Sequence, residues 1–318
     1  MKRQFGLDQI ELFANSVVTV GTFDGVHRGH QKILQRVIDR ASEKQAESAL
    51  LTFDPHPREV LQEQPMPLLS TVAERADLLE EVGIDRFIVL PFTKEFSRMQ
   101  PEQYVKEVLV DTIGLRQIVV GYDHSFGYRG RGDTQLLRSL GKTHQFDVEV
   151  ISKQIVSQAA VSSTRIRELV GETGHVREAS ELLSRPYSLA GTVVEGEKRG
   201  REIGFPTANL GNIAERKIIP ARGVYAAVVT EENAAAPLVD SSRPAMVNVG
   251  YRPTFEGEDY AVEAHILDFN GDLYGRTLRL HFIERIRDEK SFSGPDELVA
   301  QIRRDQAVCE AILEEHKM

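Results

Sequence analysis

The stretch GTFDGVHRGH at residues 21–30 decides the fold of the first half of the chain. It joins an apolar run at 17–20, typical of a strand, to a segment whose apolar residues recur at helical spacing. Glycines allow backbone to approach a ligand closely, and a helix start offers N–H groups and a positive dipole end to a phosphate. His27 and His30 would add two more donors. The pattern indicates a site for phosphoryl or nucleotidyl transfer, although a plain strand–turn–helix with two surface histidines would have the same pattern.

Short apolar runs alternate with helical patterns throughout this half. Strands are expected at 17–20, 49–53, 87–90, 118–120 and 148–151, with helices after the first strand, at 72–82 and at 104–113. Strands separated by helices predict an α/β, Rossmann-like domain with a doubly wound parallel sheet. Its ligand should lie at the carboxyl ends of the strands, which is where the histidine turn stands.

The pattern changes near residues 184–187. Closely spaced β-like runs follow at 189–194, 224–229, 245–249, 261–267 and 278–283. These runs predict antiparallel strands that close into a small β-barrel. A terminal helix should begin near Pro295, because proline is favoured in the first helical turn. We therefore expect two domains, 1–183 and 184–318.

Composition narrows the class of protein. The chain has 318 residues, enough for two domains, and a net charge of −9, which argues against broad nucleic-acid binding. No apolar stretch approaches the roughly 18 residues needed to span a bilayer, and the first residues do not resemble a signal peptide. The single cysteine, Cys309, has no disulfide partner and is expected to be a small apolar residue on the terminal helix. A cytoplasmic protein is the expectation.

Three further segments of the first half carry chemistry. Two prolines stiffen the loop at 52–57 around His56, and the loop at 121–127 offers an acidic acceptor and an aromatic ring to a planar ligand. The segment 161–167, VSSTRIR, has serine and threonine suited to cap a helix, and Arg167 suited to grip phosphate oxygens. Each segment by itself also has a plain structural interpretation. The loop at 52–57 is compatible with a rigid turn, the loop at 121–127 with a solvated loop, and the segment 161–167 with an ordinary helix cap.

Together with the histidine turn, these segments resemble the FMN adenylyltransferase module of the HxGH nucleotidyltransferases over about residues 15–183. The resemblance implies ATP contacts from Gly21, Phe23, Asp24, Gly25, His27, His30, Ser163, Thr164 and Arg167, with His27, His30 and Arg167 catalytic. It implies flavin contacts from Pro55, His56, Pro57, Asp123 and Phe126. The chain departs from the usual pattern at His124, where relatives carry phenylalanine, and at Ala160, where many carry a basic residue.

The second half contains the segment GFPTAN at residues 204–209, after glycines at 191, 196 and 200. Such glycines suit phosphate binding but are equally typical of a hairpin connection. The segment resembles the signature of riboflavin kinases, over about residues 184–318. The resemblance implies Mg²⁺ ligands at Thr207 and Asn209, and ATP contacts from Gly191, Gly200, Gly204, Pro206, Thr207 and Asn209. It also implies a general base at Glu263 and flavin contacts from Arg287 and Asp288, while His265 is assigned a structural role.

The two modules occur in the order found in bacterial bifunctional riboflavin kinase/FAD synthetases. That family phosphorylates riboflavin with MgATP and then transfers AMP from a second ATP to FMN, releasing pyrophosphate. Riboflavin, FMN and ATP are thus the expected partners, with no nucleic acid or membrane, for a monomer or weak homo-oligomer. Three alternatives remain: an adenylyltransferase site weakened by His124 and Ala160, a non-catalytic flavin carrier or sensor, and a transferase for another acceptor.

Overall fold

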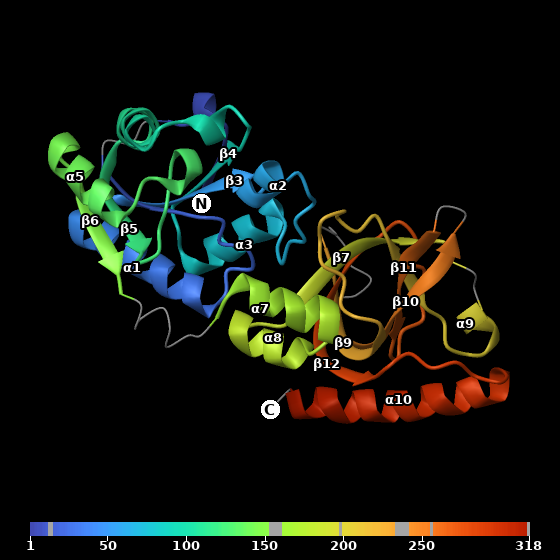
Figure 1. The fold of residues 1–318 in the computed structure, drawn as a ribbon. Coiled ribbons are helices and arrows are strands. Elements are labelled where there is room, and N and C mark those ends of the chain that lie inside the picture. Colours follow the sequence, from blue (N-terminus) through green and yellow to red (C-terminus); the bar gives the residue numbers. More distant parts are fainter. Residues whose placement is uncertain (12–14, 153–160, 197–198, 233–241, 255–256, 317–318) are drawn as a thin grey trace. The chain divides into compact units, whose positions relative to one another are not determined.

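The computed structural model describes the chain except residues 12–14, 153–160, 197–198, 233–241, 255–256 and 317–318. The chain divides into two compact units, Met1–Ser163 and Thr164–Met318. Figure 1 shows helices around a sheet in the first unit and a strand barrel with a long terminal helix in the second. Ala160 lies outside the described residues.

The first unit contains a six-stranded sheet in the order β1-β4-β3-β2-β5-β6, with all neighbouring strands parallel. Its strands are β1 (Lys2–Phe5), β2 (Ser16–Val20), β3 (Glu47–Asp54), β4 (Arg86–Pro91), β5 (Leu115–Gly121) and β6 (Asp147–Ile151). The predicted parallel sheet is confirmed, and β1 is an edge strand that the sequence pattern did not reveal. The chain runs outward from β2 in both directions, so the carboxyl end of β2 is the switch point of the sheet.

Helices cover both faces of this sheet. They are η1 (Leu7–Gln9), α1 (Arg28–Lys44), α2 (Pro57–Gln62), α3 (Val72–Val82), η2 (Phe96–Arg98), α4 (Pro101–Gln103), η3 (Tyr104–Thr112), η4 (Tyr128–Gly130) and α5 (Thr134–His144). Val17 and Leu50 face a core shared with α1 and α3, whereas Val18 and Leu51 face a core shared with η3 and α5. Since successive strand residues point to opposite faces, both faces are buried, as a doubly wound sheet requires.

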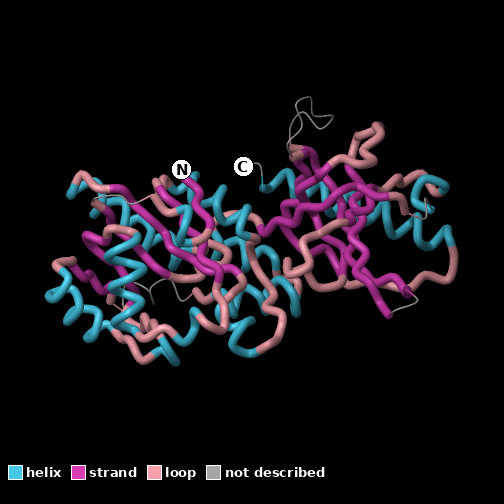
Figure 2. The backbone as a smooth tube through the Cα atoms, turned by 90° about the horizontal axis from the view of Figure 1, so that it is seen from above, coloured by secondary structure: helices cyan, strands magenta, loops and turns pink. Residues whose placement is uncertain are grey.

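The second unit is built on a closed barrel in the order β10-β11-β8-β7-β12-β9, with every neighbouring pair antiparallel. Figure 2 draws the strands of both units in magenta. Its strands are β7 (Tyr187–Val194), β8 (Ala208–Gly211), β9 (Gly223–Glu231), β10 (Arg243–Thr254), β11 (Gly257–Ile266) and β12 (Thr277–Arg287). The predicted barrel is confirmed. The short strand β8 was missed because it follows the GFPT turn without an apolar run of its own.

Helices precede and follow the barrel: α7 (Ser163–Arg167), η5 (Glu168–Thr173), α8 (Val176–Leu183), α9 (Arg199–Glu202) and α10 (Pro295–His316). The terminal helix α10 begins at Pro295, as predicted, and buries Cys309 and Leu313 against Val224 and Met246. Burial raises the pKa of the Cys309 thiol to about 11. The cysteine therefore behaves as the small core residue that the sequence predicts.

The division between the units differs from the sequence boundary at 183/184, because residues 164–183 pack with the barrel. Helix α8 contacts β7 and β12, and its buried residues Val176, Ala179 and Leu183 form one face. The carbonyl oxygen of Val170 accepts a hydrogen bond from the Ala221 amide at 2.9 Å. The short helices thus belong to the second unit by contact, although they precede its strands in the chain.

Candidate functional site

The histidine turn follows β2 directly, and the structure builds it around the start of α1. His27 is the N-cap residue, and its Nδ1 accepts a hydrogen bond from the backbone amide of His30 at 3.3 Å. Because Nδ1 is the acceptor, the neutral ring carries its proton on Nε2. The rings of His27 and His30 stack with centroids 3.6 Å apart. The turn therefore combines two imidazoles with the positive end of a 17-residue helix.

The backbone of the turn is tightly wound. Phe23, Gly25 and Val26 all have positive φ values, of 46°, 79° and 39°. Such angles are uncommon for residues other than glycine and are found where the surrounding structure enforces them, often at functional sites. Phe23 is buried, and its ring centroid lies 4.6 Å from that of His30. The Phe23 ring thus packs against the ring of His30.

The sequence predicts an ATP contact for Asp24, and the structure differs. The carboxylate is completely buried and accepts hydrogen bonds from the amides of Leu69 and Ser70, at 3.0 and 2.9 Å. The hydroxyl of Ser70 in turn accepts the amide of Gly25 at 2.8 Å, and Arg75 lies 3.9 Å from the carboxylate. Asp24 therefore anchors the turn to the segment before α3.

The serine–threonine segment approaches the same turn. The Ser163 hydroxyl donates a hydrogen bond to the backbone carbonyl of Asp24 at 3.1 Å. This contact joins residues 139 positions apart in the chain, and no local pattern could show it. Thr164 and Arg167 belong to the second unit, so their predicted contacts with ATP remain predictions.

Beside the turn, the first unit has a cavity of about 460 Å³. Gly21 and Thr22 form part of its wall, so it adjoins the histidine turn. The rest of the wall includes five aromatic residues: Phe53 in β3, Phe92 after β4, Phe96 in η2, Tyr104 at the start of η3 and Phe126 after β5. An apolar, aromatic cavity of this volume suits a planar ring system.

Of the predicted flavin contacts, Pro57 and Phe126 line this cavity, whereas Pro55, His56 and Asp123 are not among its lining residues. His56 instead caps α2, where its Nδ1 accepts the amide of Arg58 at 3.1 Å, and Asp123 is exposed. Sequence reasoning missed Phe92, Phe96 and Tyr104. The first two could have been found, because they directly follow the third predicted strand, where the carboxyl-end rule places a ligand.

Tyr104 and His124 both carry polar groups into this wall. The Tyr104 ring is 4% exposed, and its hydroxyl makes no hydrogen bond with the described part of the chain. Burial raises the pKa of Tyr104 above its ordinary value. The His124 ring stacks on Phe126 at 5.7 Å between centroids, and burial lowers its pKa to about 4. At neutral pH, both groups are therefore uncharged.

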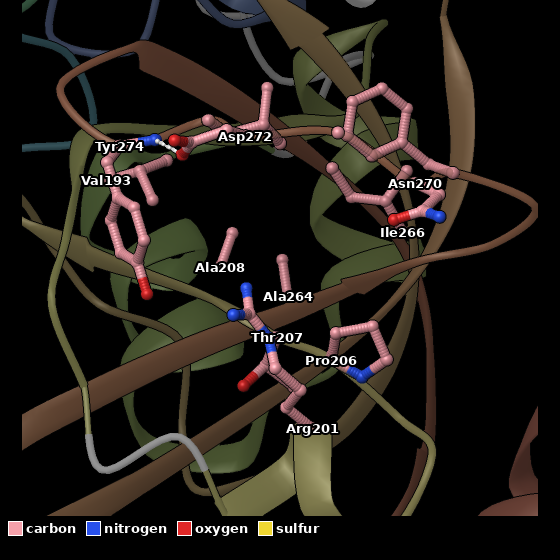
Figure 3. Close-up of a pocket in the computed structure, with 13 residues that line it drawn as sticks. Val193, Arg201, Pro206, Thr207, Ala208, Ala264, Ile266, Asn270, Asp272 and Tyr274 are labelled. Carbon is pink, nitrogen blue, oxygen red and sulfur yellow. Dashed lines mark hydrogen bonds between the residues drawn. The ribbon is translucent and has the colours of Figure 1, made fainter.

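The barrel has two cavities that share Thr207. The smaller, of about 270 Å³, is shown in Figure 3, where Tyr274, Asp272, Asn270 and Pro206 surround the small side chains of Ala208 and Ala264. The larger, of about 480 Å³, is lined by Thr207 together with Phe205, Asn248, Glu263, His265, Arg287 and Phe292, and by residues of α10. Thr207 thus stands between two spaces, each able to take part of a substrate.

Glu263 faces the larger cavity from the middle of β11. It pairs directly with Asn209 on β8 and with Asn248 on β10. Side chains that are paired across antiparallel strands lie on one face, with Cβ atoms about 5 Å apart. The backbone at Gly196 also packs on the Asn209 amide, where a Cβ would collide with it. The barrel therefore groups a carboxylate, two amides and the Thr207 hydroxyl on one wall.

The three glycines predicted to contact ATP, Gly191, Gly200 and Gly204, have different environments in the structure. Gly200 lines the larger cavity, and Gly204 has a φ of +86° in the turn before Thr207. Gly191 lies within β7, where a Cβ would stand 2.9 Å from the Gly211 carbonyl oxygen of the neighbouring strand. Gly191 is therefore needed for close strand packing and is not a lining residue of either barrel cavity.

Arg287 lines the larger cavity, but its guanidinium is already paired. Its Nε and Nη2 donate to the carboxylate of Asp305 on α10, with distances of 2.9 and 2.7 Å to Oδ2. Asp305 is 3% exposed and also accepts from Gln301 at 2.8 Å. Asp288, the other predicted flavin contact, is exposed and pairs with Arg285 instead of facing the cavity. Asp305 was missed because only the docking of α10 brings it to Arg287.

Among the described residues, no group of three or more histidine, cysteine, aspartate or glutamate side chains is arranged to hold a metal ion. Over the same residues, none of the helices combines the length and apolar character that crossing a membrane demands.

The chain matches two family models in succession, FAD synthetase over residues 9–165 and riboflavin kinase over residues 183–313. Similar curated proteins include a bifunctional riboflavin kinase/FMN adenylyltransferase of Listeria monocytogenes, 36% identical over 92% of this chain and 90% of its own length. Proteins of the same name from Pseudomonas fluorescens and Escherichia coli are 35% and 33% identical, over 93% and 91% of this chain and 92% and 90% of theirs.

A crystal structure from Streptococcus pneumoniae, titled as a macrolide-efflux protein, superposes with a TM-score of 0.85 at 30% identity. It covers 98% of this chain and 99% of its own. The order of the two family matches is the order of the parallel-sheet unit and the barrel. The chain therefore belongs to the family of bifunctional riboflavin kinases/FMN adenylyltransferases, with a FAD synthetase domain followed by a riboflavin kinase domain.

Proposed function

We propose that the barrel phosphorylates riboflavin at the Thr207 wall, and that the parallel-sheet unit adenylylates the resulting FMN at the histidine turn. The observation that carries the kinase assignment is the shared position of Thr207 between two cavities. Phosphoryl transfer needs a nucleotide and an acceptor on opposite sides of one phosphorus atom, and catalysis is mostly positioning and charge neutralisation. Two cavities that meet at one hydroxyl side chain suit that requirement.

The positions of the side chains assign the two barrel cavities. Glu263 lies only in the larger one, and a general base must be within reach of the acceptor hydroxyl. The larger cavity also has the aromatic and aliphatic groups that a flavin ring needs, among them Phe205, Phe292 and Leu298. Riboflavin therefore binds there, and Glu263 takes the proton of its 5′-hydroxyl as that oxygen attacks the γ-phosphorus of ATP. The bond from the γ-phosphorus to the β-phosphate oxygen breaks, and ADP leaves. The smaller cavity takes the nucleotide.

A magnesium ion fits the oxygen donors of this wall. Thr207 and Asn209 offer a hydroxyl and an amide oxygen, and Glu263 lies directly across from Asn209. Mg²⁺ prefers hard oxygen ligands and is commonly shared between one or two protein groups and substrate phosphates. When bound, the ion neutralises phosphate charge. The residues themselves hold the ATP phosphates in line with the acceptor hydroxyl.

In the parallel-sheet unit, the isoalloxazine ring of FMN occupies the aromatic cavity, which adjoins the turn through Gly21 and Thr22. The FMN phosphate is then the nucleophile, and it forms a bond to the α-phosphorus of ATP while the bond to pyrophosphate breaks. Because the phosphate is already ionised, no strong base is required. The start of α1, the Nε2–H of His27 and the His30 ring neutralise the developing charge, and the Ser163 hydroxyl lies at the same turn. The family resemblance assigns ATP contacts to Thr164 and Arg167 as well.

The test is a chromatographic assay with MgATP, with riboflavin supplied in one tube and FMN in another. Wild type should form FAD from both, with FMN as an intermediate in the first. His30→Ala should stop FAD formation but leave FMN formation intact, while Glu263→Gln should stop FMN formation but still convert supplied FMN to FAD. If either folded variant lost both activities, the two-site assignment would be wrong. Tight flavin binding without turnover of ATP would instead identify a carrier.

We further propose that the enzyme acts in the cytoplasm as a monomer or weak homo-oligomer and binds no nucleic acid. The absence of nucleic-acid binding is supported by the small-molecule substrates riboflavin, FMN and ATP and by the net charge of −9. Sedimentation velocity of the purified chain, with and without flavin and MgATP, would measure the oligomeric state directly.

A further inference from the structure

Thr207 stands just outside the regular hydrogen-bond ladder of the barrel. The register between β8 and β11 pairs Leu210 with Val262, Asn209 with Glu263 and Ala208 with Ala264, and it ends there. The next residue towards the N-terminus is Thr207, which adjoins both barrel cavities. The position of its hydroxyl therefore depends on what holds the turn at 204–207, since strand pairing no longer does.

His265 is the next residue of β11 after the last ladder pair, and its side chain reaches this turn. Its Nδ1 lies 2.8 Å from the backbone carbonyl oxygen of Pro206. A carbonyl oxygen only accepts hydrogen bonds, so Nδ1 carries the proton in this contact. The imidazole also meets the Phe205 ring edge to face, at 5.4 Å between centroids and 69° between planes. The His265 side chain thus contacts both Phe205 and Pro206, the two residues before Thr207.

The hydrogen bond from His265 fixes more than the position of the Pro206 carbonyl oxygen. The Pro206 carbonyl and the Thr207 amide belong to one planar peptide unit, so holding the oxygen orients the whole plane up to the Thr207 Cα. Proline also has a fixed φ and no N–H, so this residue has little freedom of its own. On the other side of the turn, the Phe205 amide donates to the Gly200 carbonyl at 2.8 Å. Both sides of the turn are therefore held.

We propose that His265 is a positioning residue of the kinase reaction, which fixes the Pro206–Thr207 peptide so that the Thr207 hydroxyl stays aligned with Glu263 and the nucleotide. The inference rests on the proposed kinase site and adds to it a residue that touches neither phosphate nor metal. His265 and Glu263 lie two residues apart on β11, so both point to the same face of the strand. Strand β11 therefore positions both the general base, Glu263, and the residue that holds the turn, His265.

This role differs from that of a second general base in its response to pH. A base must lose its proton to act, whereas the bond to Pro206 needs a proton on Nδ1 and survives when the imidazole becomes a cation. The titratable and charged groups that line the same cavity are Glu263, Arg287, Glu289, Lys290 and Asp305. The pH profile of the kinase should therefore be the same as that of wild type in a variant that keeps the bond to Pro206 by other means.

The experiment compares His265→Asn, His265→Gln and His265→Ala with Thr207→Ala. An asparagine amide nitrogen can take the place of Nδ1, whereas the longer glutamine places its amide near Nε2 instead. His265→Ala and His265→Gln should raise the KM for MgATP and lower kcat for FMN formation, together on the order of 10- to 100-fold in kcat/KM, because the loop is misplaced. His265→Asn should retain most of the wild-type kcat/KM and keep the pH profile of the wild type.

The FAD synthetase domain serves as the control in the same tube, since conversion of supplied FMN to FAD should be unchanged in all four variants. Equal activity of His265→Ala and wild type, with Thr207→Ala impaired, would overturn the positioning role alone. An unimpaired Thr207→Ala would instead overturn the proposed kinase site. If His265→Ala failed to fold, the comparison of the two amide variants would decide, and equal loss in both would count against the proposal.

Discussion

The imidazoles of His27 and His30 stack almost in parallel, with centroids 3.6 Å apart and 15° between planes, while the His27 Nδ1 accepts the His30 amide. One nitrogen of His27, Nδ1, therefore caps α1, and a phosphate contact from this ring would have to come from Nε2. The two roles of this residue can be separated by substitution.

His27→Asn should keep the cap and lose the phosphate donor, because asparagine is among the best N-cap residues but is too short to replace Nε2. We expect FAD formation from FMN to fall by about 10²- to 10³-fold in kcat/KM, with the free energy of unfolding changed by less than about 0.5 kcal/mol. His27→Ala should lose the activity and, in addition, about 1 kcal/mol of stability. Steady-state kinetics and urea unfolding of both variants test this; wild-type rates in His27→Asn would contradict it.

Asp24 supplies the second prediction, because its carboxylate holds two buried amides and lies near the buried Arg75. Asp24→Ala would leave these groups without their acceptor, and it should reduce the free energy of unfolding by about 3 kcal/mol. FAD formation should fall with it, because the turn loses its anchor. Asp39→Asn, an exposed position on α1, should change neither quantity. Loss of activity in Asp24→Ala without loss of stability would favour a direct contact with ATP.

The third prediction concerns pH. The pKa of His124 is about 4 in the folded chain, below the ordinary value of about 6.5, because burial disfavours the cation. Between these two pH values, the unfolded chain binds a proton that the folded chain does not. Folding stability from this residue is therefore intact above about pH 6.5 and declines as the pH falls towards 4, by up to about 3 kcal/mol.

His124→Phe removes this titration but keeps a ring against Phe126. Relative to this variant, wild type should lose stability progressively from pH 7 to pH 4.5, as measured by urea unfolding followed by circular dichroism. His316→Gln, at an exposed position on α10, should follow wild type across the same range. Parallel curves for wild type and His124→Phe would show that the imidazole is not held neutral in the cavity.

The fourth prediction separates stability from flavin binding at Arg287. Asp305→Asn would leave the guanidinium with an uncompensated charge, and it should cost about 3 kcal/mol of stability as well as raise the KM for riboflavin. The double variant Arg287→Met, Asp305→Leu removes both charges, so most of the stability should return. The riboflavin KM should remain high in the double variant. Recovery of both quantities would mean that Arg287 only joins β12 to α10.

Local sequence was sufficient where chemistry and structure follow from near neighbours. The alternation of strands and helices predicted the parallel sheet, and the run after residue 184 predicted the barrel. The histidine turn was predicted at the carboxyl end of a strand, and the structure places it at the switch point of the sheet. Glu263 and His265 lie on one side of β11 because side chains alternate with a period of two, a relationship that the sequence alone contains.

Tertiary structure alone decided which polar groups are already occupied by other parts of the chain. Asp24 is held by Ser70, 46 residues away, and Arg287 by Asp305, 18 residues away, so both side chains have structural partners that their motifs do not reveal. The aromatic cavity likewise gathers Phe53, Phe92, Tyr104 and Phe126 from separate strand ends and the start of η3. Periodicity and capping act over a few residues and can be found in sequence, whereas ion pairs and cavity walls depend on which distant segments the packed core brings together.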